Sequence, residues 1–236
     1  MPISVVFANE KYIAIIIDDF GNGTDDVDAM IALEIPFTGA VIPGQPHSVE
    51  HMEKLIEAGK DVIIHLPMEA PKAGWQSKLA ISGGLNSDQI RERVEKSIEE
   101  LTQAYGLNNH MGSVATANKK VMTEVIQVVK ENDLLMIDSV TTSKSKMKEV
   151  CKELEVPFIK RDVFLDRTAK HDTAFVEKRM KELAKVADKK GYAVGIGHVG
   201  TAGGLDTVAG IKNMIPVLQE QGYVFVTISQ LHTILK

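Results

Sequence analysis

Apolar, β-branched runs alternate with segments of helical periodicity along the whole chain. The runs lie at 12–18, 37–42, 61–65, 134–138, 157–164, 192–198 and 223–228, with a weaker one at 108–111. A run such as YIAIIID is apolar at almost every position, which is typical of a strand buried on both faces of a parallel sheet. Parallel strands need helical crossovers, and these are right-handed. We therefore predict an α/β fold whose βα units curl into a parallel (β/α) barrel.

The intervals between the runs carry helix signals. Asn86 and Gln89 are placed for a capping box ahead of an apolar helical face. Asn118 is placed as the N-cap of a second helix, and Gly191 as the residue that ends a third. Residues 67–85 fit neither periodicity and hold several prolines and glycines, so we predict a long loop over one end of the sheet.

Composition excludes several classes of site and partner. The 236 residues carry a net charge of −5 and a single cysteine, Cys151. One cysteine excludes an internal disulfide and any multi-cysteine zinc or iron–sulfur site, but not a metal held by histidine and carboxylate. The negative charge argues against a nucleic-acid partner bound through bulk charge. No apolar run reaches the roughly 20 residues of a spanning helix, so we expect no integral membrane segment.

The domain organisation is simple. We expect one domain over residues 12–236, preceded by an N-terminal segment over 1–11. Residues 2–8 read PISVVFA, which fits the tail of a secretory signal peptide and equally a short β-strand. No pattern in the sequence predicts an oligomeric state.

Polar residues able to bind a metal or move a proton follow the ends of the apolar runs. They are Asp18 and Asp19 after the first run, and then His65, His110, Asp138, Asp162, Asp166 and His198. In parallel α/β proteins the carboxyl ends of the strands share one rim, where active sites form. We therefore expect these side chains to converge on one site, although each also has a plainer interpretation.

The adjacent pair Asp18 and Asp19 is the strongest of these signals. Neighbouring residues of a strand point to opposite faces, so one carboxylate can hold a cation while the other accepts a proton from a water. Burying both without a cation would be costly. The plainer interpretation is a solvated strand end or a cap for the turn at 20–23.

Three histidines offer further ligands or proton donors. His65 and Glu69 are four residues apart and can share a metal as on a helix face, although Pro67 disfavours a helix and a strand-end histidine bonded to backbone is the alternative. His110 lies in NNHMGS, which suits a ligand-binding loop or a plain polar turn. His198 lies in GIGHVG, where glycines leave room for a substrate or form an ordinary turn. The histidines at 47, 51, 171 and 232 are interpreted as surface or packing residues.

Several polar and aromatic residues are candidates for substrate contacts. Asn109 and Ser113 lie beside His110, and the pair Asp138 and Ser139 can bind hydroxyls or cap the next helix. Asp162 beside Arg161 and Asp166 beside Arg167 are candidates for orienting catalytic groups, or members of ordinary ion pairs. Trp75 and Phe20 are candidate surfaces for stacking a sugar, or core residues.

Six ordered motifs resemble the divergent polysaccharide deacetylase family: IIIDDFG, HLPME, GLNNHMGS, MIDS, RDVFLD and GIGH. The resemblance runs from about residue 12 to the C-terminus. It implies a distorted or incomplete (β/α) barrel and a metal-dependent hydrolase that removes acetyl groups from an acetylated carbohydrate. The implied cofactor is a divalent metal, zinc before others, and the implied location is extracytoplasmic.

The resemblance also assigns roles to residues. It makes Asp18 the catalytic base, Asp19 a metal ligand and His198 the general acid. A second family motif normally supplies two metal-binding histidines four residues apart, whereas this chain has His65 and Glu69 at that place.

Two further positions complete the implied site. His110 falls where the typical family has an Arg-Pro-Pro-Tyr loop, which makes it a candidate for the missing imidazole. Asp162 is the candidate that orients a catalytic partner.

Two other functions stay open at this point. The missing second histidine favours a catalytically inactive glycan-binding protein of deacetylase ancestry, whereas binding alone needs neither Asp18 nor His198. A metal-dependent hydrolase of another bond, such as a phosphoester, would need a basic rim. Only Lys160, Arg161 and Arg167 lie near the motifs.

Overall fold

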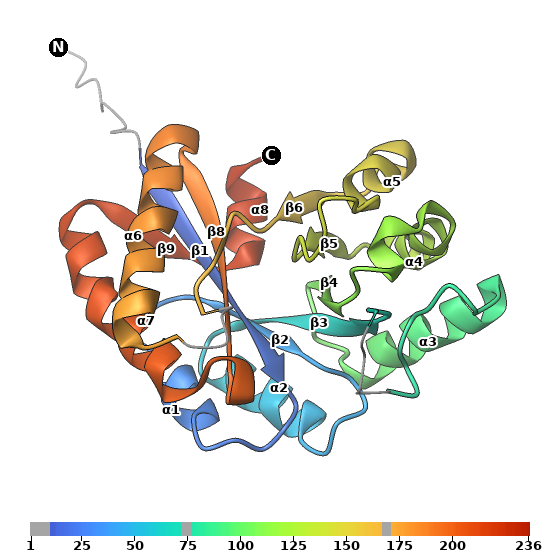
Figure 1. Cartoon of the computed structure of the whole chain (residues 1–236), viewed down its shortest axis with the longest axis horizontal. Coiled ribbons are helices and arrows are strands. Elements are labelled where there is room, and N and C mark those ends of the chain that lie inside the picture. The colour runs from blue at the N-terminus through green and yellow to red at the C-terminus, as the bar shows by residue number, and fades with distance from the viewer. Residues whose placement is uncertain (1–9, 72–76, 167–170) are drawn as a thin grey trace, which may run out of the picture.

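The computed structural model describes residues 10–71, 77–166 and 171–236 (Figure 1). The predictions for residues 2–8, Trp75 and Arg167 lie outside these ranges. The strands are β1 Lys11–Phe20, β2 Thr38–Val41, β3 Asp61–Met68, β4 Gly106–Met111, β5 Leu135–Asp138, β6 Phe158–Lys160, β7 Val163–Phe164, β8 Tyr192–His198 and β9 Tyr223–Val226. The helices are α1 Val27–Ile31, α2 Ser48–Glu57, α3 Ser87–Glu100, α4 Lys119–Glu131, α5 Met147–Leu154, α6 Thr173–Lys190, α7 Gly204–Glu220 and α8 Ile228–Ile234, with 3-10 turns η1 Ala115–Ala117 and η2 Gly200–Ala202.

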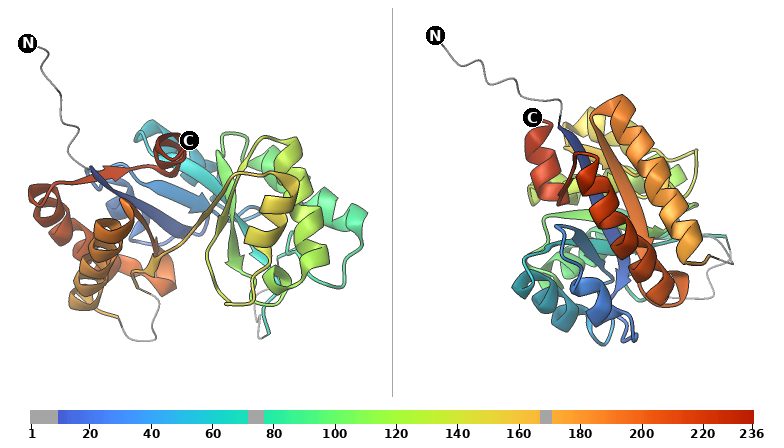
Figure 2. Two further views of the ribbon diagram at one scale, coloured as in Figure 1. Left: turned by 90° about the horizontal axis from the view of Figure 1, so that it is seen from above. Right: turned by 90° about the vertical axis from the view of Figure 1, so that its left-hand side faces the viewer.

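Within the described residues, all nine strands belong to one sheet, and every pairing in it is parallel. Their order is β6-β5-β4-β3-β2-β1-β8-β7, and β9 pairs with β1. The sheet curls into an arc, with α1 to α7 packed on its outer face (Figures 1 and 2). The predicted fold, a distorted or incomplete parallel (β/α) barrel, is confirmed.

The arc is incomplete because the predicted strand at 157–164 is divided into two. β6 pairs with β5 at one edge of the sheet, and β7 pairs with β8 at the other. The chain crosses between the edges within two residues, since the Arg161 N–H donates to Asp138 O while the Asp162 N–H donates to Val194 O. Within the described ranges β6 and β7 do not pair with each other.

The side chains form two apolar clusters, one on each face of the sheet. The outer cluster joins alternate strand residues such as Ile13, Ile15 and Ile17 to the surrounding helices. The inner cluster fills the arc and includes the apolar residues of α8. Ala14 and Ile16 of β1 belong to the inner cluster. Because side chains alternate along a strand, the next residue on the inner face is Asp18.

The same alternation places polar residues above the inner cluster on other strands. Ile63 of β3 is followed on its face by His65, and Ile196 of β8 is followed by His198. The site therefore continues the inner rows of the barrel at the carboxyl ends of its strands.

The predicted helix signals are confirmed. Asn86 and Gln89 form both hydrogen bonds of a capping box at the start of α3. The Asn118 side chain accepts hydrogen bonds from Lys120 N and Val121 N at the start of α4. Gly191 ends α6 with a φ of 80°, a conformation that glycine adopts without a Cβ clash.

Candidate metal centre and catalytic groups

A bulge at the end of β1 lets two adjacent carboxylates face one site. The pairing of β1 with β2 shifts register between Ile17 and Phe20, where two residues of β1 have no partner on β2. Those two residues are Asp18 and Asp19, and Asp19 has a φ of 73° in the left-handed region. Both carboxylates line the same hollow, although alternation along a regular strand would separate them. The bulge turns the Asp19 side chain toward the face of the sheet on which the Asp18 side chain lies.

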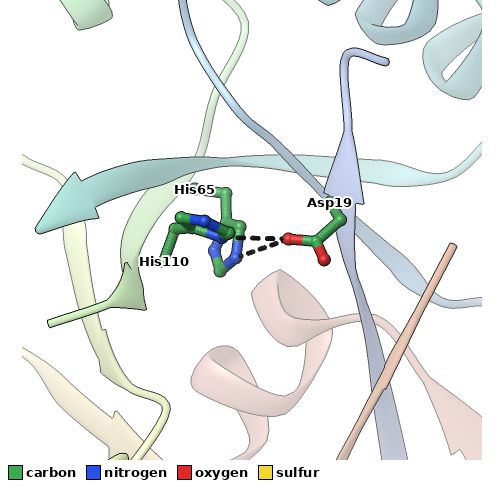
Figure 3. Close-up of side chains that lie close together, drawn as sticks. All are labelled: Asp19, His65 and His110. Carbon is green, nitrogen blue, oxygen red and sulfur yellow. Dashed lines mark hydrogen bonds and ion pairs between the residues drawn. The ribbon is translucent and has the colours of Figure 1, made fainter. Parts of the chain in front are cut away.

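His65 from β3 and His110 from β4 face Asp19 (Figure 3). The His65 Nε2 atom lies 3.3 Å from Asp19 Oδ1, and the His110 Nδ1 atom lies 3.0 Å from the same oxygen. The two imidazole rings are edge-on, with centroids 4.9 Å apart. One ligand atom from each of the three residues lies within 4.8 Å of the others. The structure thus brings together three of the four predicted metal ligands.

Asn108 of β4 prepares His65 to bind a cation. The side chain of Asn108 is fully buried, and its Oδ1 atom lies 2.7 Å from His65 Nδ1. Because an amide oxygen only accepts, the Nδ1 atom carries a proton, and Nε2 is the nitrogen that faces the cluster and would serve as the metal ligand after losing its own proton. The Asn108 amide nitrogen donates to Asp18 Oδ1 at 2.8 Å and to Ser139 Oγ at 3.2 Å.

The donor set of this cluster fits a divalent metal. Two imidazoles and one carboxylate form a set that zinc binds in catalytic sites, with further coordination positions left open. Asp19 Oδ1, His65 Nε2 and His110 Nδ1 are the atoms that would hold it, since they already face one another. A cation binds a histidine nitrogen only when that nitrogen carries no proton, so binding at this site would depend on pH.

Glu69, the fourth predicted ligand, lies elsewhere. β3 is extended through Met68, so His65 and Glu69 are separated by about 13 Å of strand rather than by one helical turn. The Glu69 carboxylate accepts a hydrogen bond from Gly83 N at 2.9 Å instead. The helix-face spacing inferred from the sequence does not apply here because Pro67 is part of the strand.

His198 of β8 lies opposite Asp18. Asp18 and His198 are register partners in the parallel pairing of β1 and β8, and His198 Nε2 lies 4.0 Å from Asp18 Oδ2. The other ring nitrogen, Nδ1, lies 2.7 Å from Asp166 Oδ1. Asp166 is fully buried, and its second oxygen accepts from His198 N at 2.7 Å and from Thr207 Oγ1 at 2.9 Å.

Asp162, predicted to orient a catalytic group, does not reach His198. Its carboxylate accepts from Lys190 Nζ at 2.8 Å and from Val194 N at 2.9 Å. Val194 precedes His198 by four strand residues, which corresponds to about 13 Å. Asp166 takes the orienting position because β7 and the residues after it run alongside β8 toward the carboxyl end.

The predicted substrate-contacting residues divide into two groups. Asn109 and Ser139 line the hollow and are bonded to each other, because Ser139 N donates to Asn109 Oδ1 at 3.0 Å. Asp138 is buried, and its Oδ1 atom accepts from Val140 N at 2.7 Å. Ser113 lies in the turn after β4 and does not line the hollow.

The aromatic surface of the hollow is Phe164 rather than the predicted Phe20. Phe20 is fully buried in the core. Phe164 lines the hollow and stacks on the His198 ring, with centroids 5.8 Å apart and an interplanar angle of 26°. The Arg161 guanidinium lies 3.6 Å from the centre of the Phe164 ring.

The hollow formed by these groups is called the catalytic hollow below. It has a volume of about 200 Å³. Its walls include Asp18, Asp19, His65, His110, Ser139 and His198. Asn108 and Asp166 lie behind these walls and bond to Asp18 and His198. The sequence signal for both is a polar residue at or near the end of a buried strand.

The environment drives the pKa values of the two adjacent carboxyls in opposite directions. Burial raises the pKa of Asp18, and the nearby His65 and His198 only partly offset this effect. Burial also acts to raise the pKa of Asp19, but hydrogen bonds from His110 and His65 outweigh it and hold that pKa well below its usual range. Asp19 is therefore the permanent anion, and Asp18 is the better proton acceptor.

His198 is poised to donate a proton. Burial lowers its pKa, but the hydrogen bond and charge of Asp166 and the charge of Asp18 outweigh burial and raise the pKa to about 9. Its imidazole is therefore protonated at neutral pH and can act as a general acid.

A second group of histidines and a carboxylate lies at the start of α2. His47 Nδ1 lies 2.8 Å from Glu50 Oε2, and the rings of His47 and His51 are stacked with centroids 5.6 Å apart. Gly21 N donates to His51 Nδ1 at 2.9 Å, so the proton of the neutral His51 ring is on Nε2. Neither nitrogen of His51 then has a free lone pair for a cation.

Comparisons with known proteins agree with this architecture. Residues 15–232 match the family model described as divergent polysaccharide deacetylase. An uncharacterised protein of Haemophilus influenzae is 33% identical over 195 residues, which are 83% of this chain and 69% of that protein.

Two solved structures share the fold at low sequence identity. An uncharacterised protein of Agrobacterium tumefaciens has a TM-score of 0.85 at 18% identity, over 95% of this chain and 90% of that one. A CE4-family pseudoenzyme of Bacillus anthracis has a TM-score of 0.62 at 14% identity, over 95% of this chain and 66% of that one. A mutant of the pseudoenzyme is described as having restored enzymatic activity.

The fold defines the class first: an incompletely closed parallel (β/α) barrel of the type found in CE4 deacetylases. Within that class, the chain belongs to the divergent polysaccharide deacetylase family. The resemblance inferred from the six motifs is thereby confirmed. Within the described ranges, no helix combines the length and apolar character needed to cross a bilayer.

Proposed function

We propose that this protein is a metal-dependent hydrolase that removes acetyl groups from an acetylated carbohydrate. One observation carries the proposal: a carboxylate with a raised pKa and a protonated imidazole face each other 4.0 Å apart, directly beside a three-residue donor set for a cation. Acyl transfer to water needs a base, an acid and a stabiliser of negative charge. Family membership supports a carbohydrate as the substrate.

The residues of this chain have distinct tasks in the proposed reaction. Asp18 accepts a proton as a water oxygen forms its bond to the acyl carbon. His198 Nε2 donates a proton to the amine or alcohol as the bond from the acyl carbon to nitrogen or oxygen breaks. The products are acetic acid, which ionises, and the free sugar amine or hydroxyl.

Supporting residues hold these groups in place. Asn108 fixes the Asp18 carboxylate through its amide N–H, and Asp166 holds the His198 ring through Nδ1. Asp19, His65 and His110 would hold a divalent cation, for which zinc is our choice. Such a cation polarises an acyl carbonyl and lowers the pKa of a water.

The test is acetate release from acetylated chitooligosaccharides and peptidoglycan fragments by zinc-supplied protein. Asp18→Asn and His198→Gln should each lower the rate about 100-fold or more, since each removes one proton transfer. Glu50→Gln is the matched control, because it neutralises a carboxylate outside the catalytic hollow. No acetate release by the unmodified chain on any of these substrates would contradict the proposal.

The second candidate is glycan binding without cleavage. The specific observation in its favour is Glu69, which stands where the family has a second metal-binding histidine and lies outside the cluster. The likeness to a CE4 pseudoenzyme supports the same candidate. Binding of acetylated oligosaccharides with no acetate release, with or without added zinc, would favour it.

A further inference from the structure

A second hollow opens beside the catalytic hollow, and we call it the acyl annex. Its volume is about 410 Å³, twice the 200 Å³ of the catalytic hollow. The two hollows share four wall residues: Asp19, His110, Met111 and Ala202. A group attached to a carbonyl in the catalytic hollow can therefore extend into the annex without leaving the protein surface.

The deeper walls of the annex are apolar. They include Ile42 and Val199, which backbone hydrogen bonds tie to the end of β1: Ile42 N donates to Phe20 O at 2.8 Å, and Val199 N to Asp18 O at 3.1 Å. Ala202 adds a methyl group between the two hollows. These walls are fixed by the sheet and offer no hydrogen bonds to a sugar hydroxyl.

The polar residues of the annex do not change this character. Asn22 and Thr201 are exposed residues at its rim. The Thr24 hydroxyl oxygen is buried and has no hydrogen-bond partner within the described ranges, so it is covered by the wall rather than presented to a ligand. An alkyl chain therefore suits the interior of the annex better than a hydroxylated ring does.

A third hollow, whose wall also includes Met111, is more polar than the annex. It has a volume of about 480 Å³, and its walls include the polar side chains of Glu69, Ser77, Ser82 and Arg93. It meets the catalytic hollow at Met111. An acylated sugar has one hydroxyl-rich half and one alkyl half, and the two hollows offer one matching surface to each.

We propose that the acyl annex binds acyl chains longer than acetyl, of four to six carbons, on the carbohydrate substrate. This inference rests on the proposed function and sharpens it, because it names the acyl group. An acetyl group has about the size of two water molecules, roughly 60 Å³, and would leave most of the annex filled with water. Each methylene moved from water onto apolar walls should improve kcat/KM about fourfold.

The reaction is the same hydrolysis with a longer acid as its product. The water oxygen forms a bond to the acyl carbon, and the bond from that carbon to the sugar nitrogen or oxygen breaks. Asp18 takes the proton of the water, and His198 protonates the leaving group. The products are a butanoate or hexanoate ion and the free sugar.

The first test is the acyl-length profile of the unmodified, zinc-supplied chain on 4-nitrophenyl acetate, butanoate and hexanoate. Butanoate should exceed acetate in kcat/KM about 15-fold after correction for spontaneous hydrolysis, because it adds two methylenes. A profile that is flat, or highest for acetate, would contradict acyl binding in the annex without contradicting the proposed hydrolase activity.

Two matched variants locate the preference. Ala202→Leu adds bulk between the catalytic hollow and the annex, and it should reduce the butanoate-to-acetate ratio to about one. Ala70→Leu makes the same substitution in the polar hollow and should leave that ratio unchanged. Equal loss of the ratio in both variants would overturn the assignment to the annex.

A binding measurement separates failure of the annex from failure of the hydrolase. Methyl glycosides of N-acetyl-, N-butanoyl- and N-hexanoylglucosamine are titrated against the Asp18→Asn variant by calorimetry. Tighter binding with each longer acyl chain supports the annex even if no substrate is cleaved. Binding that ignores acyl length would overturn the annex, whether or not esters are hydrolysed.

Discussion

The Asp19–His65–His110 cluster and the His47–Glu50–His51 cluster each bring two imidazoles and one carboxylate within 4.8 Å of one another. In the first, an amide oxygen accepts from His65 Nδ1 and leaves Nε2 free to bind a cation. In the second, a backbone N–H donates to His51 Nδ1 and so assigns the proton to Nε2. The hydrogen-bond partner of each imidazole ring therefore decides whether a histidine cluster can hold a cation.

Burial separates the two clusters as well. In the first cluster the side chains of His65 and Asp19 are 2% and 21% exposed, whereas in the second those of His47 and Glu50 are 44% and 51% exposed and His51 alone is buried. A buried carboxylate between imidazoles is stabilised by the charge of a cation, whereas an exposed ion pair is already solvated by water. The largest expected effects are therefore confined to the first cluster.

The largest expected difference between the two clusters is in zinc affinity after one carboxylate is removed from each. Asp19→Ala should weaken zinc binding more than about 100-fold, because a direct ligand contributes more than the outer partners that already account for 10–100-fold. Glu50→Ala should leave zinc binding unchanged. Competition titration against a chelating dye measures both, and similar losses in the two variants would erase the distinction between the clusters.

Removing the amide that orients His65 tests the tautomer argument. Asn108→Leu should weaken zinc binding about 10–100-fold, because the His65 ring loses the partner that fixes its proton on Nδ1. It should also lower the free energy of unfolding by about 2 kcal/mol, since Asp18 and Ser139 lose a buried partner. Unchanged zinc affinity in a folded Asn108→Leu protein would show that the amide does not prepare the site.

His198 and His51 should have pKa shifts of opposite sign, because Asp166 raises the pKa of His198 and burial lowers that of His51. In zinc-free protein the pKa of His198 is raised to about 9, whereas burial lowers the pKa of His51 below its usual value. Asp166→Asn should move the His198 pKa down toward about 6.5 and leave His51 unaffected. Imidazole NMR titration measures both rings in one sample, and an unmoved His198 would remove Asp166 from its positioning role.

The ion pair of His198 with Asp166 makes the free energy of unfolding depend on pH. A folded-state pKa of about 9 lies above the unfolded value of about 6.5, so His198 contributes stability that is complete below pH 6.5 and is lost as the pH rises through 9. The loss should amount to about 3 kcal/mol in the unmodified protein and should disappear in Asp166→Asn. Urea unfolding at several pH values between 6 and 10 measures it.

The smallest effect on the free energy of unfolding is expected at the exposed pair of His47 and Glu50. His47→Ala should change the free energy of unfolding by less than about 0.5 kcal/mol, because surface ion pairs contribute little. His65→Ala, the matched change in the buried cluster, should cost several times more in zinc-free protein, because the Asn108 amide oxygen then stays unpaired. Urea unfolding of the two variants side by side tests the contrast, which fails if their costs are equal.

The sequence predicts the barrel well because strand burial and helix caps are local signals. Runs such as 12–18 and the cap at Asn118 are read directly from neighbouring residues, and both are confirmed. The division of 157–164 into β6 and β7 was not predictable, because it depends on bonds to β5 on one side and β8 on the other. Non-local pairing of this kind leaves no periodic trace in the sequence.

The site shows the same limit. Asp19, His65 and His110 were expected to converge, since each ends a strand of one parallel sheet. The helix-face pairing of His65 with Glu69 was wrong because β3 stays extended past Pro67. Of the two candidates for the orienting carboxylate, Asp162 was preferred to Asp166, because only the register of β7 against β8 distinguishes them.

The register of β1 against β8 has a practical consequence for engineering. Asp18 and His198 are partners in an uninterrupted parallel ladder of seven residue pairs, so the backbone of two central strands fixes the span between donor and acceptor. Several segments that shape the annex and the polar hollow, such as residues 22–24, 200–202 and 80–82, lie outside that ladder. Such segments can be exchanged between homologues as interchangeable modules, while the distance that a proton travels stays constant.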